Sequence, residues 1–146
     1  MEPARATAAS TLAMALLALA GCAVFEPRYS ETALTSMESA YSEVSTLVAA
    51  TDLGQFGDPS SYDGAADRYA GTIGQIALAR QSVAVGGGKP GSPASKASEL
   101  MLEQIDACTE AVTLMANQHR QGGLTAGAGY GSARIACAIP LTNMQN

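Results

Sequence analysis

Hydrophobic residues recur at steps of three and four positions through three long stretches of the chain. The first stretch runs from Ser30 to about Thr51. Its apolar positions are Leu34, Met37, Tyr41, Val44 and Val48, widened by Leu47. This spacing puts them on one face of an α-helix, because 3.6 residues make one turn. Ser30 is predicted to cap the helix N-terminus, and Glu31 is favourable in its first turn.

The second stretch runs from Pro59 to about Val85 and follows Asp58, a capping residue placed directly before a proline. Its apolar positions are Tyr62, Ala66, Tyr69, Ile73, Ile76 and Val83. Arg80 stands where this stripe would continue, so we expect it to reach the bundle end or to pair with an acidic residue across an interface. A pocket with Arg80 at its floor is the functional alternative.

Small residues form a second surface on the same predicted helix. They are Ala70, Gly71, Gly74 and Ala77. Each glycine costs about 1 kcal/mol relative to alanine in a helix. The close approach of a neighbouring helix would explain them, and a kink is the other interpretation.

The third stretch runs from Pro93 to about Gln121, after a glycine-rich break at 86–91 and the cap-and-proline pair Ser92-Pro93. Its stripe is Met101, Ile105, Cys108, Val112, Met115 and His119. Gly122-Gly123 is predicted to end this helix.

A weaker fourth segment covers about two helical turns, from Ser132 to Ala138, with Pro140 predicted to end it and 140–146 predicted to be a frayed tail. The sequence shows no convincing alternation for a strand. Short loops between long amphipathic helices favour an antiparallel arrangement. The fold class expected is therefore all-α: an antiparallel bundle of three long helices plus a short disulfide-linked fourth helix, over 30–139.

Composition narrows the functional classes. The chain has 146 residues, a formal net charge of −5 and 14% charged residues, which suits one domain. The acidic balance argues against a nucleic-acid partner, which would need a basic face. The same balance predicts no basic patch for anionic lipid heads.

The N-terminus carries a second kind of signal. An uncharged apolar run spans Thr11 to Gly21, which is too short for a bilayer but suits a signal peptide. The run ends Leu19-Ala20-Gly21-Cys22, which resembles the lipobox of bacterial lipoproteins. The resemblance implies that 1–21 is a signal peptide and 22–29 a tether lipidated at Cys22. Because Ala23 rather than Asp follows, it also implies the outer membrane, facing the periplasm.

Two cysteines remain once Cys22 carries lipid. Cys108 and Cys137 are an even pair in an oxidising compartment, so we expect a disulfide between them. The enclosed loop of about 30 residues would contribute roughly 3–4 kcal/mol. Two buried thiols that only pack are the alternative. A redox-active pair is disfavoured because the CxxC spacing is missing.

Four residue sets contain side chains that are typical of chemical sites. Met101, Met115 and His119 include two soft ligands one turn apart, yet they also suit an ordinary core with His119 charged at the helix C-terminus. Asp63 and Asp67 suit the start of a helix, with Arg68 beside them in solvent. Glu99, Glu103, Asp106 and Glu110 form an acidic face, solvated or used for docking. Gly127, Gly129 and Gly131 lack the phosphate-loop spacing.

No catalytic, cofactor or metal site is therefore assigned, and we expect no enzyme. The sequence favours a small lipid-anchored envelope protein of structural or interaction type, bound to an envelope protein or to itself. Apolar residues off the stripes would mark such a surface: Leu78, Leu102 and Leu124. The alternative is a bundle that binds a small ligand or metal, with a cavity near Gly71 and Gly74 lined by Tyr41, Tyr69 and Met115.

Overall fold

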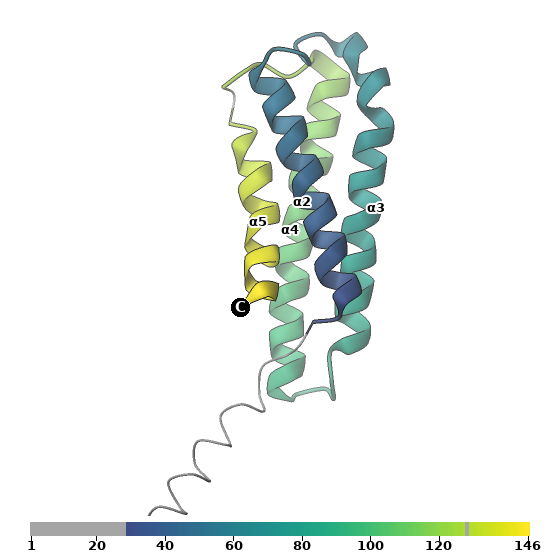
Figure 1. The fold of residues 1–146 in the computed structure, drawn as a ribbon, viewed down its shortest axis with the longest axis vertical. Coiled ribbons are helices and arrows are strands. Elements are labelled where there is room, and N and C mark those ends of the chain that lie inside the picture. The colour runs from purple at the N-terminus through teal and green to yellow at the C-terminus, as the bar shows by residue number, and fades with distance from the viewer. Residues whose placement is uncertain (1–28, 128) are drawn as a thin grey trace, which may run out of the picture.

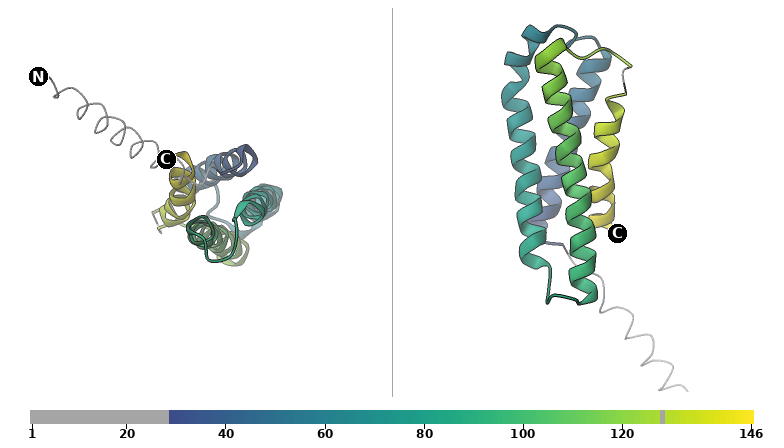
Figure 2. Two further views of the ribbon diagram at one scale, coloured as in Figure 1. Left: turned by 90° about the horizontal axis from the view of Figure 1, so that it is seen from below. Right: turned by 180° about the vertical axis from the view of Figure 1, so that it is seen from behind.

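The computed structural model describes residues 29–127 and 129–146, which form a four-helix bundle (Figure 1). Its elements are α2 (Glu31–Asp52), the 3-10 turn η2 (Pro59–Ser61), α3 (Tyr62–Gly86), α4 (Pro93–Gly122) and α5 (Gly131–Gln145). Both α2 and α4 pack against α3 and α5, so the four helices close a ring, as the end-on view in Figure 2 shows. The predicted fold class is confirmed. The lipobox lies outside the described residues.

The three predicted N-caps are present. Ser30 Oγ accepts a hydrogen bond from the Ala33 amide at 3.2 Å, and Ser92 Oγ accepts one from the Ser95 amide at 3.1 Å. The Asp58 carboxylate accepts from the Ser60 amide at 2.8 Å and caps η2. Each cap satisfies one of the amides that have no partner in the first turn. These local signals fix where the helices begin.

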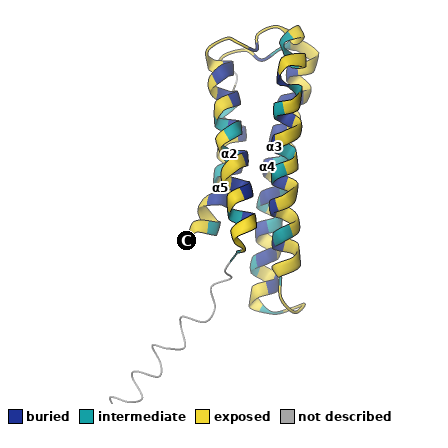
Figure 3. Cartoon of the chain, turned by 45° about the vertical axis from the view of Figure 1, so that its right-hand side comes forward, coloured by how far each residue is buried: buried dark blue, intermediate teal, exposed yellow. Residues whose placement is uncertain are grey.

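Buried side chains line the inner faces of the helices and exposed ones cover the outside (Figure 3). On α4 all six stripe positions are buried, as predicted. On α3 the buried face is turned slightly from the expected one and consists of Ala65, Tyr69, Thr72, Ile76, Ala79 and Val83. Thr72 fits there because its hydroxyl donates to the Arg68 carbonyl at 2.8 Å, which satisfies the buried polar group within the helix.

The expected close helix packing at Gly71 and Gly74 is wrong. Both glycines are exposed, and a Cβ built on either would meet nothing within 4 Å. Arg80 is also exposed, because the buried face passes through Ala79 instead. Its guanidinium pairs with the Asp106 carboxylate of α4 at 2.6 and 3.1 Å, which confirms the expected pairing across an interface.

The last helix is longer than predicted. α5 continues through Pro140 to Gln145, so the prediction that Pro140 ends it is wrong. A proline in a helix loses one backbone hydrogen bond. Here Pro140 and Leu141 are buried against the bundle, and that packing holds the segment helical. The predicted Cys108–Cys137 disulfide is present and fixes α5 to α4.

The two ends of the bundle differ in which segments meet there. At one end the α2–η2 connection and the α4–α5 loop come together. At the other end the α3–α4 connection projects beyond the start of α2 and the end of α5 (Figures 1 and 2). Among the described helices, none combines the length and apolar character that a membrane span requires.

Candidate functional site

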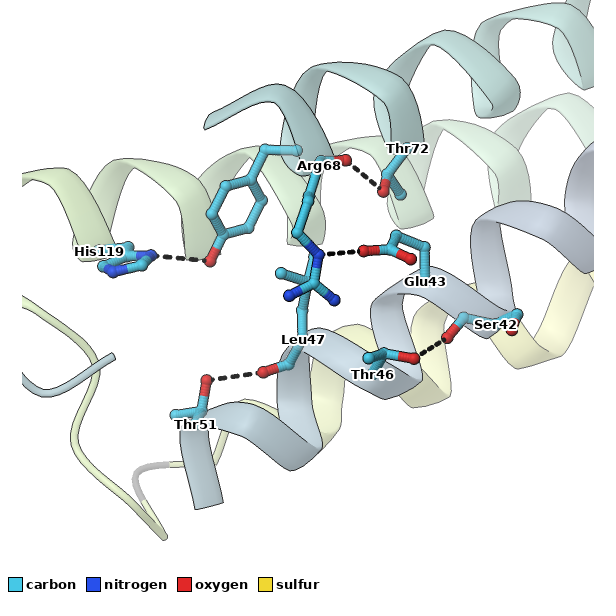
Figure 4. A network of polar contacts seen from close by, with 9 residues as sticks. Ser42, Glu43, Thr46, Leu47, Thr51, Arg68, Thr72 and His119 are labelled. Atoms are coloured by element: carbon cyan, nitrogen blue, oxygen red, sulfur yellow. Dashed lines mark hydrogen bonds and ion pairs between the residues drawn. The ribbon is translucent and has the colours of Figure 1, made fainter. Parts of the chain in front are cut away.

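The densest group of chemically versatile side chains surrounds His119, near the C-terminal end of α4. The side chain is fully buried, and each ring nitrogen has a partner from another element. Nε2 lies 2.8 Å from Ser61 Oγ at the start of α3. Nδ1 lies 3.2 Å from the Tyr69 hydroxyl, two turns further along α3 (Figure 4). The imidazole therefore bridges two points on the neighbouring helix.

Aromatic rings enclose this imidazole. Phe56 lies with its centroid 4.6 Å from that of His119, and Tyr62 meets the imidazole edge-on at 5.5 Å. Tyr69 lies at 5.9 Å, also edge to face. Such tilted and edge-on contacts suit the charge distribution of aromatic rings. The His119 imidazole is therefore surrounded by aromatic rings.

The hydrogen-bond partners decide the protonation state of the imidazole. The Ser61 hydroxyl donates to the Asp58 carbonyl at 2.5 Å, so its oxygen accepts from Nε2–H of His119. Nδ1 then accepts from the Tyr69 hydroxyl. This assignment, inferred from the network, gives a neutral ring with all donors and acceptors used. The expectation of a charged His119 at the helix C-terminus is wrong.

Burial acts on both titratable groups in the same sense, toward the neutral form. It lowers the pKa of His119 below its usual value, because a buried imidazolium would lose its hydration. It also raises the pKa of the Tyr69 phenol well above its usual range. Since the Ser61 proton is directed at a carbonyl, this serine is not aligned as a nucleophile toward His119.

Loop backbone closes the cluster from outside. The Leu124 amide donates to the Phe56 carbonyl at 2.6 Å, and the Leu124 side chain is fully buried. Gly123 has φ 74° and ψ 173°, a conformation that essentially only glycine adopts. A Cβ there would collide with the Gly57 carbonyl. Gly123 therefore lets the two loops touch.

Of the three candidate soft metal ligands, Met101 lies far from Met115 and His119. Met115 and Met101 are buried in the core, but Met101 lies 18 residues before His119, about 27 Å along the helix. Both His119 nitrogens already have partners. Among the described residues, no group of three or more histidine, cysteine or acidic side chains is arranged to hold a metal ion.

A second polar feature lies between α2 and α3. Arg68 Nε is 2.5 Å from Glu43 Oε1 (Figure 4). Both residues line an open groove of about 470 Å³. Asp67 and Gly71 also line this groove. Arg68 is thus half-buried and paired across an interface rather than standing in solvent, which corrects that expectation. Asp63 and Asp67 are both exposed.

The remaining candidate sets stay on the surface. Glu99, Glu103 and Glu110 are exposed along α4, while Asp106 is half-buried in its pair with Arg80. Gly127 and Gly129 both have positive φ in the loop before α5, and the residue between them is not described. They therefore shape a turn ahead of a helix.

The residues proposed to form a cavity or an exposed patch are distributed differently. Tyr69 and Met115 are each 2% exposed and belong to the core, and Tyr41 is half-buried against it. Leu78 is 48% exposed, as expected. Leu124 is completely buried and Leu102 packs against the core, so neither extends an apolar surface.

Comparison with known proteins adds no relative: no protein family, curated protein or solved structure matches this chain.

The hydrophobic pattern and the motifs of the sequence did not predict the His119 cluster, because its members come from η2, α3, α4 and two loops. Ser61 and His119 are 58 residues apart. The one available signal was a histidine on a buried stripe, which requires polar partners somewhere in the fold.

Proposed function

We propose that the chain is a small lipid-anchored protein of the bacterial cell envelope, which acts through its outer surfaces in a structural or interaction role. The observation that carries this proposal is the Cys108–Cys137 disulfide in a chain that begins with a lipobox-like segment. Disulfides persist in oxidising compartments such as the periplasm. The third cysteine, Cys22, is then the residue left for the lipid.

The His119 cluster supports a structural role. Its polar atoms satisfy one another, and aromatic and loop residues cover them. Buried polar networks of this kind specify how helices pack. The most chemically versatile side chains of the described residues therefore serve to join α3 and α4.

Lipidation is tested by expressing the full chain in a bacterium with two membranes and labelling the cells with a radioactive or clickable palmitate. The wild type should carry label, and Cys22→Ala should carry none. Cys108→Ser is the matched control and should keep the label, since it removes a different cysteine. Label on Cys22→Ala, or none on the wild type, would contradict the lipid anchor.

The interaction role is tested by crosslinking in cells. A photo-crosslinker placed at Leu78, which is exposed on α3, should give a discrete product with an envelope protein or a second copy. The same crosslinker at buried Ile76 is the control. The alternative, a small-ligand or metal binding module, would instead give extra mass in native mass spectrometry of the mature protein.

A further inference from the structure

Charge is unevenly distributed along the bundle, although the chain as a whole is acidic. From Arg68 to Ser98 the sequence has four basic residues and no aspartate or glutamate. Arg68 and Arg80 are neutralised by carboxylates on neighbouring helices. Within the described part of the chain, Lys89 and Lys96 have no such ion pair, and both are exposed.

These two lysines, the only ones in the chain, lie at the end formed by the α3–α4 hairpin. We call this region, residues 85–96, the hairpin tip. Lys89 is in the connection between the helices, and Lys96 is in the first turn of α4. Val85, near the C-terminal end of α3 and therefore in the same hairpin, is 84% exposed. The tip therefore offers two free ammonium groups and one apolar side chain.

The start of the described chain lies against the same end. Tyr29 and Ser30 share a small surface depression with Gly86, Ala94 and other residues of the two hairpin helices. The figures agree, because α2 begins at the end of the bundle where the hairpin projects (Figures 1 and 2). Tyr29 follows Cys22 by seven positions, a span of at most about 25 Å in a fully extended chain.

We propose that the hairpin tip rests on the membrane surface, with Lys89 and Lys96 against the phosphates of anionic phospholipids. The proposal depends on lipidation at Cys22, since the short tether then holds this end close to the bilayer. Each lysine near an anionic surface adds about 1 kcal/mol of attraction. The net negative charge of the chain predicts no basic patch. Net charge is a sum over the whole surface, however, and does not show where the lysines lie.

The positions of the carboxylates favour the same orientation. Glu31 lies at the start of α2, set back from the projecting hairpin, and the Glu99 carboxylate accepts a hydrogen bond from Ser95 Oγ at 3.1 Å. Four exposed aspartates cluster in sequence around the opposite end: Asp52, Asp58, Asp63 and Asp67. An anionic membrane attracts the tip and repels the far end only when that end comes within about 10 Å of the surface, so an upright bundle is favoured over one that lies flat.

The test uses the two lysines as natural reporters. The mature lipidated protein is reconstituted in vesicles of phosphatidylcholine alone or with 30% phosphatidylglycerol, and reacted with an amine acetylating reagent. Peptide mass spectrometry then gives the acetylation rate at each lysine. We expect both lysines to react about fivefold more slowly in the anionic vesicles, the factor that corresponds to about 1 kcal/mol per lysine. Half-molar salt should restore the rates.

Variants separate charge from proximity. Lys89→Gln should weaken the protection of Lys96, whereas Arg134→Gln, on the first turn of α5, should leave both lysines protected. Equal rates in the two kinds of vesicle would overturn the proposal. So would equal protection by inorganic phosphate added to phosphatidylcholine vesicles, because a small anion would then be the ligand.

Different results would contradict the proposed lipid anchor and the proposed membrane contact of the hairpin tip. If the purified protein lacks the mass of a diacylglyceryl group and does not float with phosphatidylcholine vesicles, the proposed lipid anchor is wrong. If it floats with both kinds of vesicle but its lysines react equally in each, the anchor stands and the membrane contact of the tip is wrong.

Discussion

The two ends of the bundle are built by different means. At the His119 end, residues from η2, α3, α4 and two loops meet through directed hydrogen bonds, and Gly123 permits the loops to touch. At the hairpin end, a short connection at 87–92 joins α3 to α4, and its cap is the local bond between Ser92 and Ser95. One end depends on long-range partners, and the other on near neighbours.

The contrast between the two ends indicates where sequence changes should affect stability and where they should affect binding. The polar side chains of the His119 cluster satisfy one another, so removing one leaves others without partners. Side chains at the hairpin tip are exposed and free to contact something outside the chain. We therefore expect stability to be concentrated at the first end and interaction at the second. Four predictions follow, in order of decreasing effect.

The largest effect should come from opening the disulfide. Cys137→Ser should lower the free energy of unfolding by about 3–4 kcal/mol, because a link that spans 29 residues no longer restricts the unfolded chain. Urea denaturation under oxidising conditions measures this. Hydrogen exchange should accelerate first in α5, while the hairpin tip keeps the protection of the wild type. An unfolding midpoint that is the same with and without reductant would contradict the prediction.

The second effect compares one glycine at each end. Gly123→Ala should cost about 2 kcal/mol or more, because the new methyl group meets the Gly57 carbonyl in a backbone conformation unsuited to alanine. Gly91→Ala is the control at the hairpin tip, where φ is also positive at 80° but nothing lies within 4 Å of a Cβ. It should cost about 1 kcal/mol. Equal losses in thermal or urea unfolding would show that the loop contact is unimportant.

The third effect removes one hydroxyl from the His119 cluster. Tyr69→Phe should lower the unfolding free energy by about 1–2 kcal/mol, since Nδ1 of a buried imidazole loses its donor. Tyr41→Phe, at a half-buried position on α2 outside the cluster, should change it by less than about 0.5 kcal/mol. If the two variants are equally stable, the Tyr69 hydroxyl does not support the imidazole.

The smallest effect is a dependence of stability on pH. Because burial lowers the pKa of His119, the unfolded chain binds a proton that the folded chain refuses. Stability is therefore full above about pH 6.5, the ordinary histidine value, and falls as the pH drops below it. Urea midpoints at pH 7.5 and 5.5 measure the fall.

His119→Gln provides the control for this pH effect. It should remove the loss between pH 7.5 and 5.5, because no other histidine is present in the chain. Asp58, whose pKa is lowered by its hydrogen bonds to Ser60, titrates below this range. A wild type that becomes more stable on acidification would contradict the neutral, buried imidazole.

The sequence predicted the helices well because their signals are local. The three- and four-residue steps placed α2, α3 and α4, and the caps at Ser30, Asp58 and Ser92 marked their starts. The disulfide was predicted because two cysteines remain once Cys22 is assigned to the lipid. Some helical details were wrong. Thr72 is buried although a polar residue is not expected in the core, and the helix continues past Pro140 because packing outweighs one lost hydrogen bond. The glycines Gly71 and Gly74 are exposed and do not admit a neighbouring helix.

The candidate site could not be predicted, because long-range packing makes it. Nothing local to Phe56 or Leu124 shows that their loops meet, and both residues lie outside any periodic stripe. The hydrophobic pattern placed Ser61 at the start of a helix and did not connect it with His119. At the hairpin tip, the absence of acidic residues over 68–98 was visible in the sequence, but its position beside Tyr29 required the fold.

The four helix pairs of the ring are expected to form in a particular order during folding. The α3–α4 pair is joined by a short connection, so it can form early at little entropic cost, whereas the seam between α2 and α5 brings the two ends of the folded chain together. The hydrogen bond between Gln145 and Glu38 spans 107 residues. We therefore expect the contacts between α2 and α5 to form after those between α3 and α4.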